Sequence, residues 1–165
     1  MLCGVAVLNQ IILVGTSHSI QRDKSRSDFS DYIKGLIEKY NIGAIAEEID
    51  DQSVVADLST KLGVFYRNIE PTPEERKALG ISSLNEIDCS IFMEFDDPNS
   101  QSAQTESKVR KEKVYARRES EWLARVKNIN SFPILVICGA NHFQSFGDLL
   151  KKNGFQVMDE CKLWK

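Results

Sequence analysis

Two continuous apolar runs that each close on a glycine constrain the fold of this chain more than any other feature. They are residues 10–15 (Gln-Ile-Ile-Leu-Val-Gly) and residues 133–139 (Pro-Ile-Leu-Val-Ile-Cys-Gly). A short, β-branched run with apolar residues at both alternating positions is typical of a strand that is buried on both faces. Strands of this kind belong to parallel sheets that helices cover on both sides.

Segments with helical periodicity alternate with short strands along the rest of the chain. Apolar spacing predicts helices over 29–40, 54–62, 108–130 and 143–150, and short strands over 43–46, 64–66 and 155–158. A capping threonine before Pro73 and the capping box Ser83-x-x-Glu86 predict two further helix starts. This alternation predicts an α/β fold: an open, mostly parallel sheet of about four to five strands with helices on both faces.

Length and composition indicate one globular domain over residues 1–165. The polar segment 96–105 is expected to be a mobile loop within that domain. With 42% hydrophobic residues, 27% charged residues and a net charge of −3, neither nucleic acid nor a membrane surface is expected as a partner. The four cysteines form no C-x-x-C pair, and the apolar opening lacks a charged region before it, so we expect free thiols and a cytoplasmic protein.

The only two histidines of the chain occupy matching positions after the two buried strands. Gly15-Thr-Ser-His18 follows the first run, and Gly139-Ala-Asn-His142 follows the second. The strand over 43–46 runs into the acidic pair Glu47-Glu48. Because parallel strands with right-handed crossovers place their carboxyl ends at one edge, we expect these side chains to converge there.

Imidazole and carboxylate donors at one edge suit manganese, zinc or iron, with His18, Glu47 and His142 as candidate ligands. Adjacent residues of a strand point to opposite faces, so only one of Glu47 and Glu48 is expected to face the site, and Glu47 is favoured by position. A metal-bound water with a carboxylate as base would carry out hydrolysis near neutral pH. The alternative is that both histidines are structural, as helix caps or surface hydrogen-bonding groups.

Other side chains are candidates for supporting roles. On the charged helix, Arg117 or Arg118 could steady developing negative charge, with Arg118 favoured. Either Glu119 or the member of the Glu47-Glu48 pair that does not hold the ion, Glu48 in the favoured arrangement, could act as the general base. Gln21 and Arg22 follow the first histidine closely enough to reach the site. Ser17 and Cys138 are weaker candidates as nucleophiles, because Ser17 has no evident base and Cys138 lies within a predicted buried strand.

The order of these motifs resembles the TraB/Tiki proteins, which form a superfamily with the erythromycin esterases and the ChaN-like haem-binding proteins. The resemblance places the family's first histidine at His18, its acidic pair at Glu47-Glu48 and its second histidine at His142. Its arginine falls on Arg117 or Arg118. The segment 71–105 has no counterpart in this pattern, and the chain is shorter than usual members.

Members of that superfamily have been viewed as metal-dependent proteases, as metal-free esterases and as haem binders, so the resemblance implies no single activity. The expected function is hydrolysis of amide or ester bonds in a small molecule or peptide, with or without a divalent metal ion. In the metal-free form, a histidine and a glutamate would activate water directly. The alternative function is a non-catalytic module that binds a small ligand or haem.

Overall fold

A computed structural model describes residues 9–49 and 52–165 of the chain. Contacts divide it into two compact units: residues 1–70 with 122–165, and residues 71–121. The first unit contains the sheet and the second is helical. The single domain over 1–165 stays a prediction.

The first unit contains a parallel sheet, as expected. Its strands are β1 (Gln10–Thr16), β2 (Ala44–Glu47), β3 (Phe65–Asn68), β4 (Ile134–Gly139) and β5 (Gln156–Cys161). Its helices are α1 (His18–Arg22), α2 (Ser27–Tyr40), α3 (Val54–Leu62) and α7 (Phe143–Lys152). Within the described residues the sheet has the order β3-β2-β4-β1-β5, and each neighbouring pair is parallel. The predicted α/β fold is therefore confirmed.

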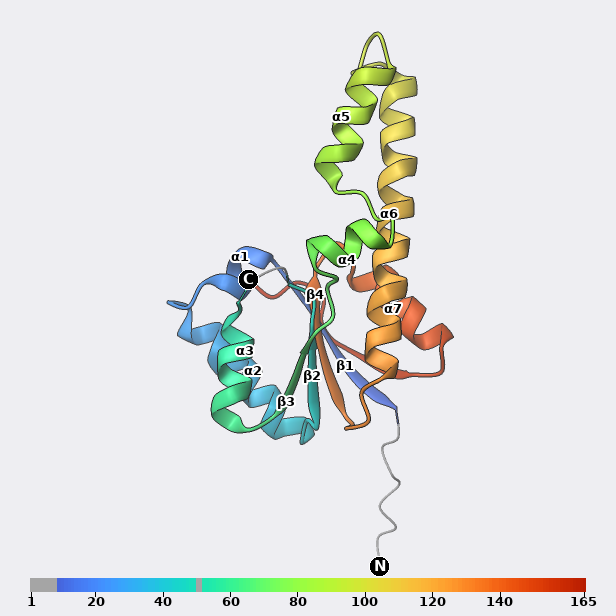
Figure 1. Ribbon diagram of the computed structural model, residues 1–165. Coiled ribbons are helices and arrows are strands. Elements are labelled where there is room, and N and C mark those ends of the chain that lie inside the picture. The colour runs from blue at the N-terminus through green and yellow to red at the C-terminus, as the bar shows by residue number, and fades with distance from the viewer. Residues whose placement is uncertain (1–8, 50–51) are drawn as a thin grey trace, which may run out of the picture. The chain divides into compact units, whose positions relative to one another are not determined.

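Helices cover both faces of this sheet, with α2 and α3 on one side and α7 on the other (Figure 1). The β1 strand shows why its sequence is apolar at every position from 11 to 14. Ile12 and Val14 pack with α2 and α3, whereas Ile11 and Leu13 pack with α7. All four side chains are fully buried, so the prediction of a strand buried on both faces is confirmed.

Local sequence signals set most helix ends. Asn41 in the left-handed conformation ends α2, and Gly63, with φ of 68°, ends α3. The polar stretch after β1 forms one helix that periodicity did not predict. There the Ser17 hydroxyl accepts a hydrogen bond from the backbone N–H of Ile20 and starts α1 directly at His18.

The chain's carboxyl-terminal residues pack against the end of β1. The backbone N–H of Trp164 donates to the carbonyl of Gly15 at 2.8 Å, and the Thr16 hydroxyl donates to the Trp164 carbonyl at 3.1 Å. The Trp164 ring also lies 4.9 Å, centroid to centroid, from the ring of Phe29. These contacts hold the turn that leads from β1 to His18.

The second unit contains α4 (Pro73–Ala78), α5 (Leu84–Glu94) and most of α6 (Gln101–Lys127). Both predicted capping signals operate, because Thr72 and Ser83 each form a complete capping box. The expected loop 96–105 is shorter than predicted, since α6 already begins at Gln101. The Ser100 hydroxyl accepts from the backbone N–H of Ala103, and Ala103 is buried in the core of this unit.

None of the helices in the described ranges is long and apolar enough to cross a membrane.

Candidate functional site

The connections that follow two neighbouring strands leave the sheet on opposite faces. After β1 the chain passes through α1 to α2 on one face, and after β4 it enters α7 on the other face. Strands β1 and β4 are adjacent, so the connections change from one face of the sheet to the other between these two strands. Open α/β sheets bind their ligands at such a point. His18 follows β1 directly, and Gly139 ends β4.

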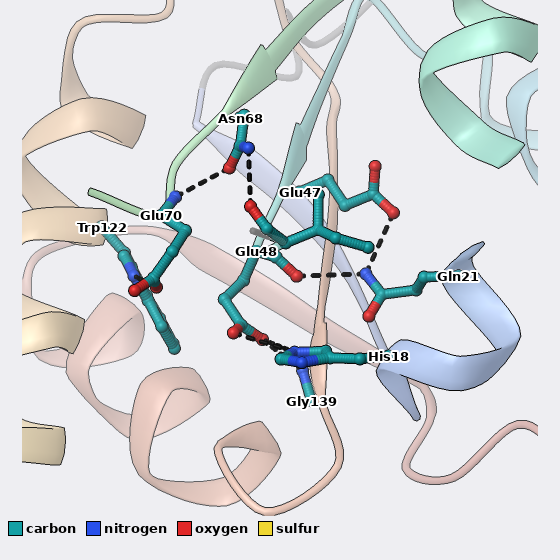
Figure 2. Close-up of polar contacts among 9 residues, drawn as sticks. His18, Gln21, Glu47, Glu48, Asn68, Glu70, Trp122 and Gly139 are labelled. Atoms are coloured by element: carbon teal, nitrogen blue, oxygen red, sulfur yellow. Dashed lines mark hydrogen bonds and ion pairs between the residues drawn. The ribbon is translucent and has the colours of Figure 1, made fainter. Parts of the chain in front are cut away.

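His18 and Glu48 form a close pair at this point (Figure 2). The His18 Nε2 atom lies 2.9 Å from each of the two Glu48 carboxylate oxygens. The Glu48 side chain is 1% exposed, whereas 35% of the His18 side chain remains accessible. The pair therefore presents an imidazole to solvent and keeps the carboxylate that orients it buried.

A backbone amide fixes the Glu48 carboxylate from the other side. The N–H of Gly139 donates to Glu48 Oε2 at 2.8 Å. A Cβ atom at position 139 would lie 3.4 Å from Glu48 Oε2, which is an ordinary contact, and 2.8 Å from Asn141 Oδ1, so an added side chain would mainly displace the Asn141 amide. The second Gly-x-x-His turn thus contributes the backbone N–H of Gly139 to the His18–Glu48 pair.

Glu47 points to the face covered by α2 and α3, away from the pair's own face. Its carboxylate is fully buried and accepts hydrogen bonds from Gln21 Nε2 at 2.9 Å, from the Ser53 hydroxyl at 2.5 Å and from the Tyr66 hydroxyl at 2.7 Å. Burial raises the pKa of Glu47, although these three donors oppose the shift. Strand alternation was the correct reason to separate the two glutamates, but Glu48, and not the favoured Glu47, is the one that contacts His18.

Gln21 joins the two glutamate positions. Besides its bond to Glu47, its Nε2 atom donates to the backbone carbonyl of Glu48 at 3.1 Å. The Gln21 side chain is fully buried, and its Oε1 atom has no hydrogen-bond partner among the described residues. Sequence position alone had suggested that Gln21 reaches the site.

His142 occupies the start of α7 and is 3% exposed. Its ring packs edge-on against Trp122, with 4.8 Å between ring centroids. The indole Nε1 of Trp122 donates in turn to Glu70 Oε2 at 2.8 Å. The two matching histidines thus have different surroundings: His18 is half-buried beside a carboxylate, and His142 is buried against an aromatic ring.

Sequence reasoning missed two polar groups at the end of β3, Asn68 and Glu70. The Asn68 side chain donates to the carbonyl of Ile49 at 2.6 Å and accepts from the backbone N–H of Glu70 at 2.9 Å, which ties the end of β3 to the segment that follows β2. The available signal was positional, because Glu70 follows a predicted strand just as Glu47 and Glu48 do. Ser53 and Tyr66 gave no comparable signal.

The arginine and glutamate predicted on the charged helix lie in the second unit. Arg117 donates to the carbonyls of Leu79 and Gly80, at 2.5 and 3.0 Å, so it stabilises the turn after α4. Arg118 and Glu119 follow it on α6, and Glu119 is buried. Their roles at the site stay predictions, because the His18–Glu48 pair and the hydrogen-bond partners given for it all belong to the first unit.

The two weaker candidate nucleophiles have other structural roles. The Ser17 hydroxyl caps α1 and lies 2.8 Å from the hydroxyl of Ser19. Cys138 is fully buried within β4, as predicted.

The structure gives no support for the predicted set of metal ligands. Within 9–49 and 52–165, no group of three or more histidine, cysteine, aspartate and glutamate side chains is arranged to hold an ion. The carboxylate of Glu47 is instead directed to Gln21, Ser53 and Tyr66, and the ring of His142 to Trp122. The prediction of a site made by His18, Glu47 and His142 is not supported.

Comparison with known proteins identifies no relative: no family model, no curated protein and no solved structure matches the chain.

Proposed function

We propose that this chain hydrolyses ester or amide bonds, with His18 as the general base that activates water. The observation that carries the proposal is the His18–Glu48 pair. A buried carboxylate that accepts from Nε2–H keeps the neutral imidazole in one tautomer, and Nδ1 is then the ring's acceptor. An acceptor nitrogen on a partly exposed ring can take a proton from water.

Glu48 supplies the second requirement of such a base. When His18 takes a proton from water, the imidazolium that forms lies 2.9 Å from both carboxylate oxygens. Because Glu48 is buried and fixed by the Gly139 amide, it needs no reorganisation to stabilise this charge. The pair thus acts as an oriented base without a bound metal ion.

The resemblance to the TraB/Tiki proteins remains part of the proposal, as do a small-molecule or peptide substrate and a cytoplasmic location. The free state of Cys89, Cys138 and Cys161 supports a reducing compartment.

The second candidate function is a module that binds a small ligand without turnover. Gln21 Oε1 favours it, because a buried acceptor without a protein partner is a group that a donor on a ligand could satisfy. A haem ligand has no comparable observation in its favour.

Turnover of a panel of nitrophenyl esters and aminoacyl nitroanilides by the wild type and by His18→Ala tests the proposal. General-base catalysis contributes about 10²- to 10⁴-fold, so a loss of this size in kcat is expected for the variant. Gln144→Ala, on an exposed face of α7, is the control and should keep full activity. Turnover by His18→Ala within threefold of wild type would overturn the proposal.

A chelator separates the two forms of hydrolysis. Turnover that survives prolonged treatment with a chelator but still requires His18 supports the metal-free base. Turnover that is lost with the chelator and restored by manganese, zinc or iron would contradict it.

A further inference from the structure

The side-chain amide of Gln21 connects two elements that lie far apart in the sequence. Gln21 lies on α1, three residues after His18, whereas Glu47 and Glu48 lie at the end of β2. A single nitrogen, Nε2, donates both to Glu47 Oε1 at 2.9 Å and to the backbone carbonyl of Glu48 at 3.1 Å. Figure 2 shows this nitrogen between the two acceptors. Both of its hydrogens are therefore engaged.

The geometry of the His18–Glu48 pair depends on how α1 lies against the end of β2. Residues three apart share one face of a helix, so His18 and Gln21 both face the end of β2. His18 contacts the Glu48 side chain, and Gln21 contacts the Glu48 main chain. A shift of α1 would change both contacts together, and the Gln21 amide opposes such a shift.

The other half of the amide shows why glutamine occupies this position. Gln21 Oε1 is buried without a hydrogen-bond partner among the described residues, which destabilises the folded chain. Reversing the amide would not relieve this cost, because Oε1 would then face two acceptor oxygens. An apolar side chain of similar length would avoid the cost of burying this carbonyl. The two hydrogen bonds that Nε2 donates therefore explain why a glutamine occupies position 21.

We infer that Gln21 is a positioning residue, which holds His18 at the distance and in the tautomer that the Glu48 carboxylate requires. The effect of Gln21 on catalysis rests on the proposed function. The effect of Gln21 on the position and tautomer of His18 does not, because the tautomer can be measured without a substrate.

The test compares Gln21→Met, which keeps the length of the side chain and removes the donor, with the matched control Gln144→Met. Gln144 Nε2 also donates to a carboxylate, that of Asp148, but on an exposed helix surface. Nitrogen NMR of protein labelled at histidine reports the tautomer of each ring, and with two histidines in the chain the spectra are simple to assign. Wild type and Gln144→Met should show His18 as the Nε2–H tautomer, and Gln21→Met should show a mixture of tautomers.

On a substrate that the wild type hydrolyses, Gln21→Met should lower kcat by about 10- to 100-fold and leave KM within threefold, as expected for misplacement of a base. A purely structural role would change the midpoint of unfolding but not the tautomer of the folded fraction. An unchanged His18 tautomer in folded Gln21→Met overturns the inference even if the wild type is an active hydrolase. If the wild type shows no turnover, a tautomer change in Gln21→Met still supports the inference, and only the proposed function fails.

Hydrogen exchange in the wild type covers the case in which Gln21→Met does not fold. The two Nε2 protons of Gln21 should exchange far more slowly than those of Gln144. Exchange at the rate of Gln144 would show that the link to Glu47 and Glu48 does not form, and it would overturn the inference.

Discussion

Replacing Glu48 with glutamine changes one oxygen of the carboxylate to an NH₂ group and leaves the shape of the side chain unaltered. The Gly139 N–H lies 2.8 Å from Oε2 and can still donate to an oxygen in that position. The NH₂ group then takes the position of Oε1, which is 2.9 Å from His18 Nε2. One N–H of this amide would oppose the Nε2–H of His18, whereas the remaining oxygen, in the position of Oε2, still lies 2.9 Å from Nε2 and can accept from it. The preference for the Nε2–H tautomer is therefore lost, and His18 should also populate the Nδ1–H tautomer, which accepts from the amide at Nε2.

We expect Glu48→Gln to affect kcat more than the free energy of unfolding. A His18 ring with its proton on Nδ1 presents no acceptor to water, and in either tautomer the carboxylate that stabilises the imidazolium is lost. Placing a catalytic histidine in the wrong tautomer lowers kcat by about 10⁴-fold in serine proteases. For Glu48→Gln we expect a fall of about 10³- to 10⁴-fold, equivalent to about 4–5.5 kcal/mol in the activation free energy.

The assay combines kcat on an ester or amide substrate with nitrogen NMR of His18. Glu112→Gln, the same change at an exposed position on α6, is the control and should leave both measurements unaltered. The argument is refuted if Glu48→Gln keeps the Nε2–H tautomer and retains kcat within tenfold of wild type.

Two further predictions concern stability. Burial raises the pKa of Glu47 in the folded chain above its ordinary value of 4.5. At pH values between 4.5 and this raised pKa, unfolding releases a proton, so the free energy of unfolding falls as pH rises. Glu47→Gln removes this dependence, and its stability relative to wild type should increase as pH rises from about 4.5, measured by denaturant unfolding at several pH values; parallel curves would contradict this. A Cβ atom at Gly15 would lie 2.2 Å from the Lys162 carbonyl, so Gly15→Ala should destabilise the chain by about 1–3 kcal/mol. The control Gly35→Ala, on α2 with no atom within 4 Å of the added carbon, should stabilise it by about 0.5–1 kcal/mol, and equal unfolding free energies for the two variants would refute the packing argument.

Local sequence determined the strands and the longer helices of the first unit, and the edge of the sheet at which His18 and the glutamate pair lie. The continuous apolar runs predicted β1 and β4, because a strand between two helical layers can carry apolar side chains at every position. Short-range chemistry also predicted the helix ends at Asn41 and Gly63, the capping threonine before Pro73 and the capping box at Ser83. Parallel strand direction then placed His18 and the glutamate pair at one edge, since all carboxyl ends of such a sheet meet there.

Tertiary structure decided which of those side chains contact one another. The sequence shows that Glu47 and Glu48 point to opposite faces, but the face that His18 reaches depends on the packing of α1, a helix of five residues without apolar periodicity. The two turns share the pattern Gly-x-x-His. Only the residues that pack around each turn distinguish the half-buried His18 from the buried His142. The donors Gln21, Ser53 and Tyr66 meet on Glu47 from three separate segments, and no pattern within any one of those segments predicts that meeting. Periodicity and capping depend on residues a few positions apart, whereas these contacts join residues up to 91 positions apart and form only when the sheet is assembled.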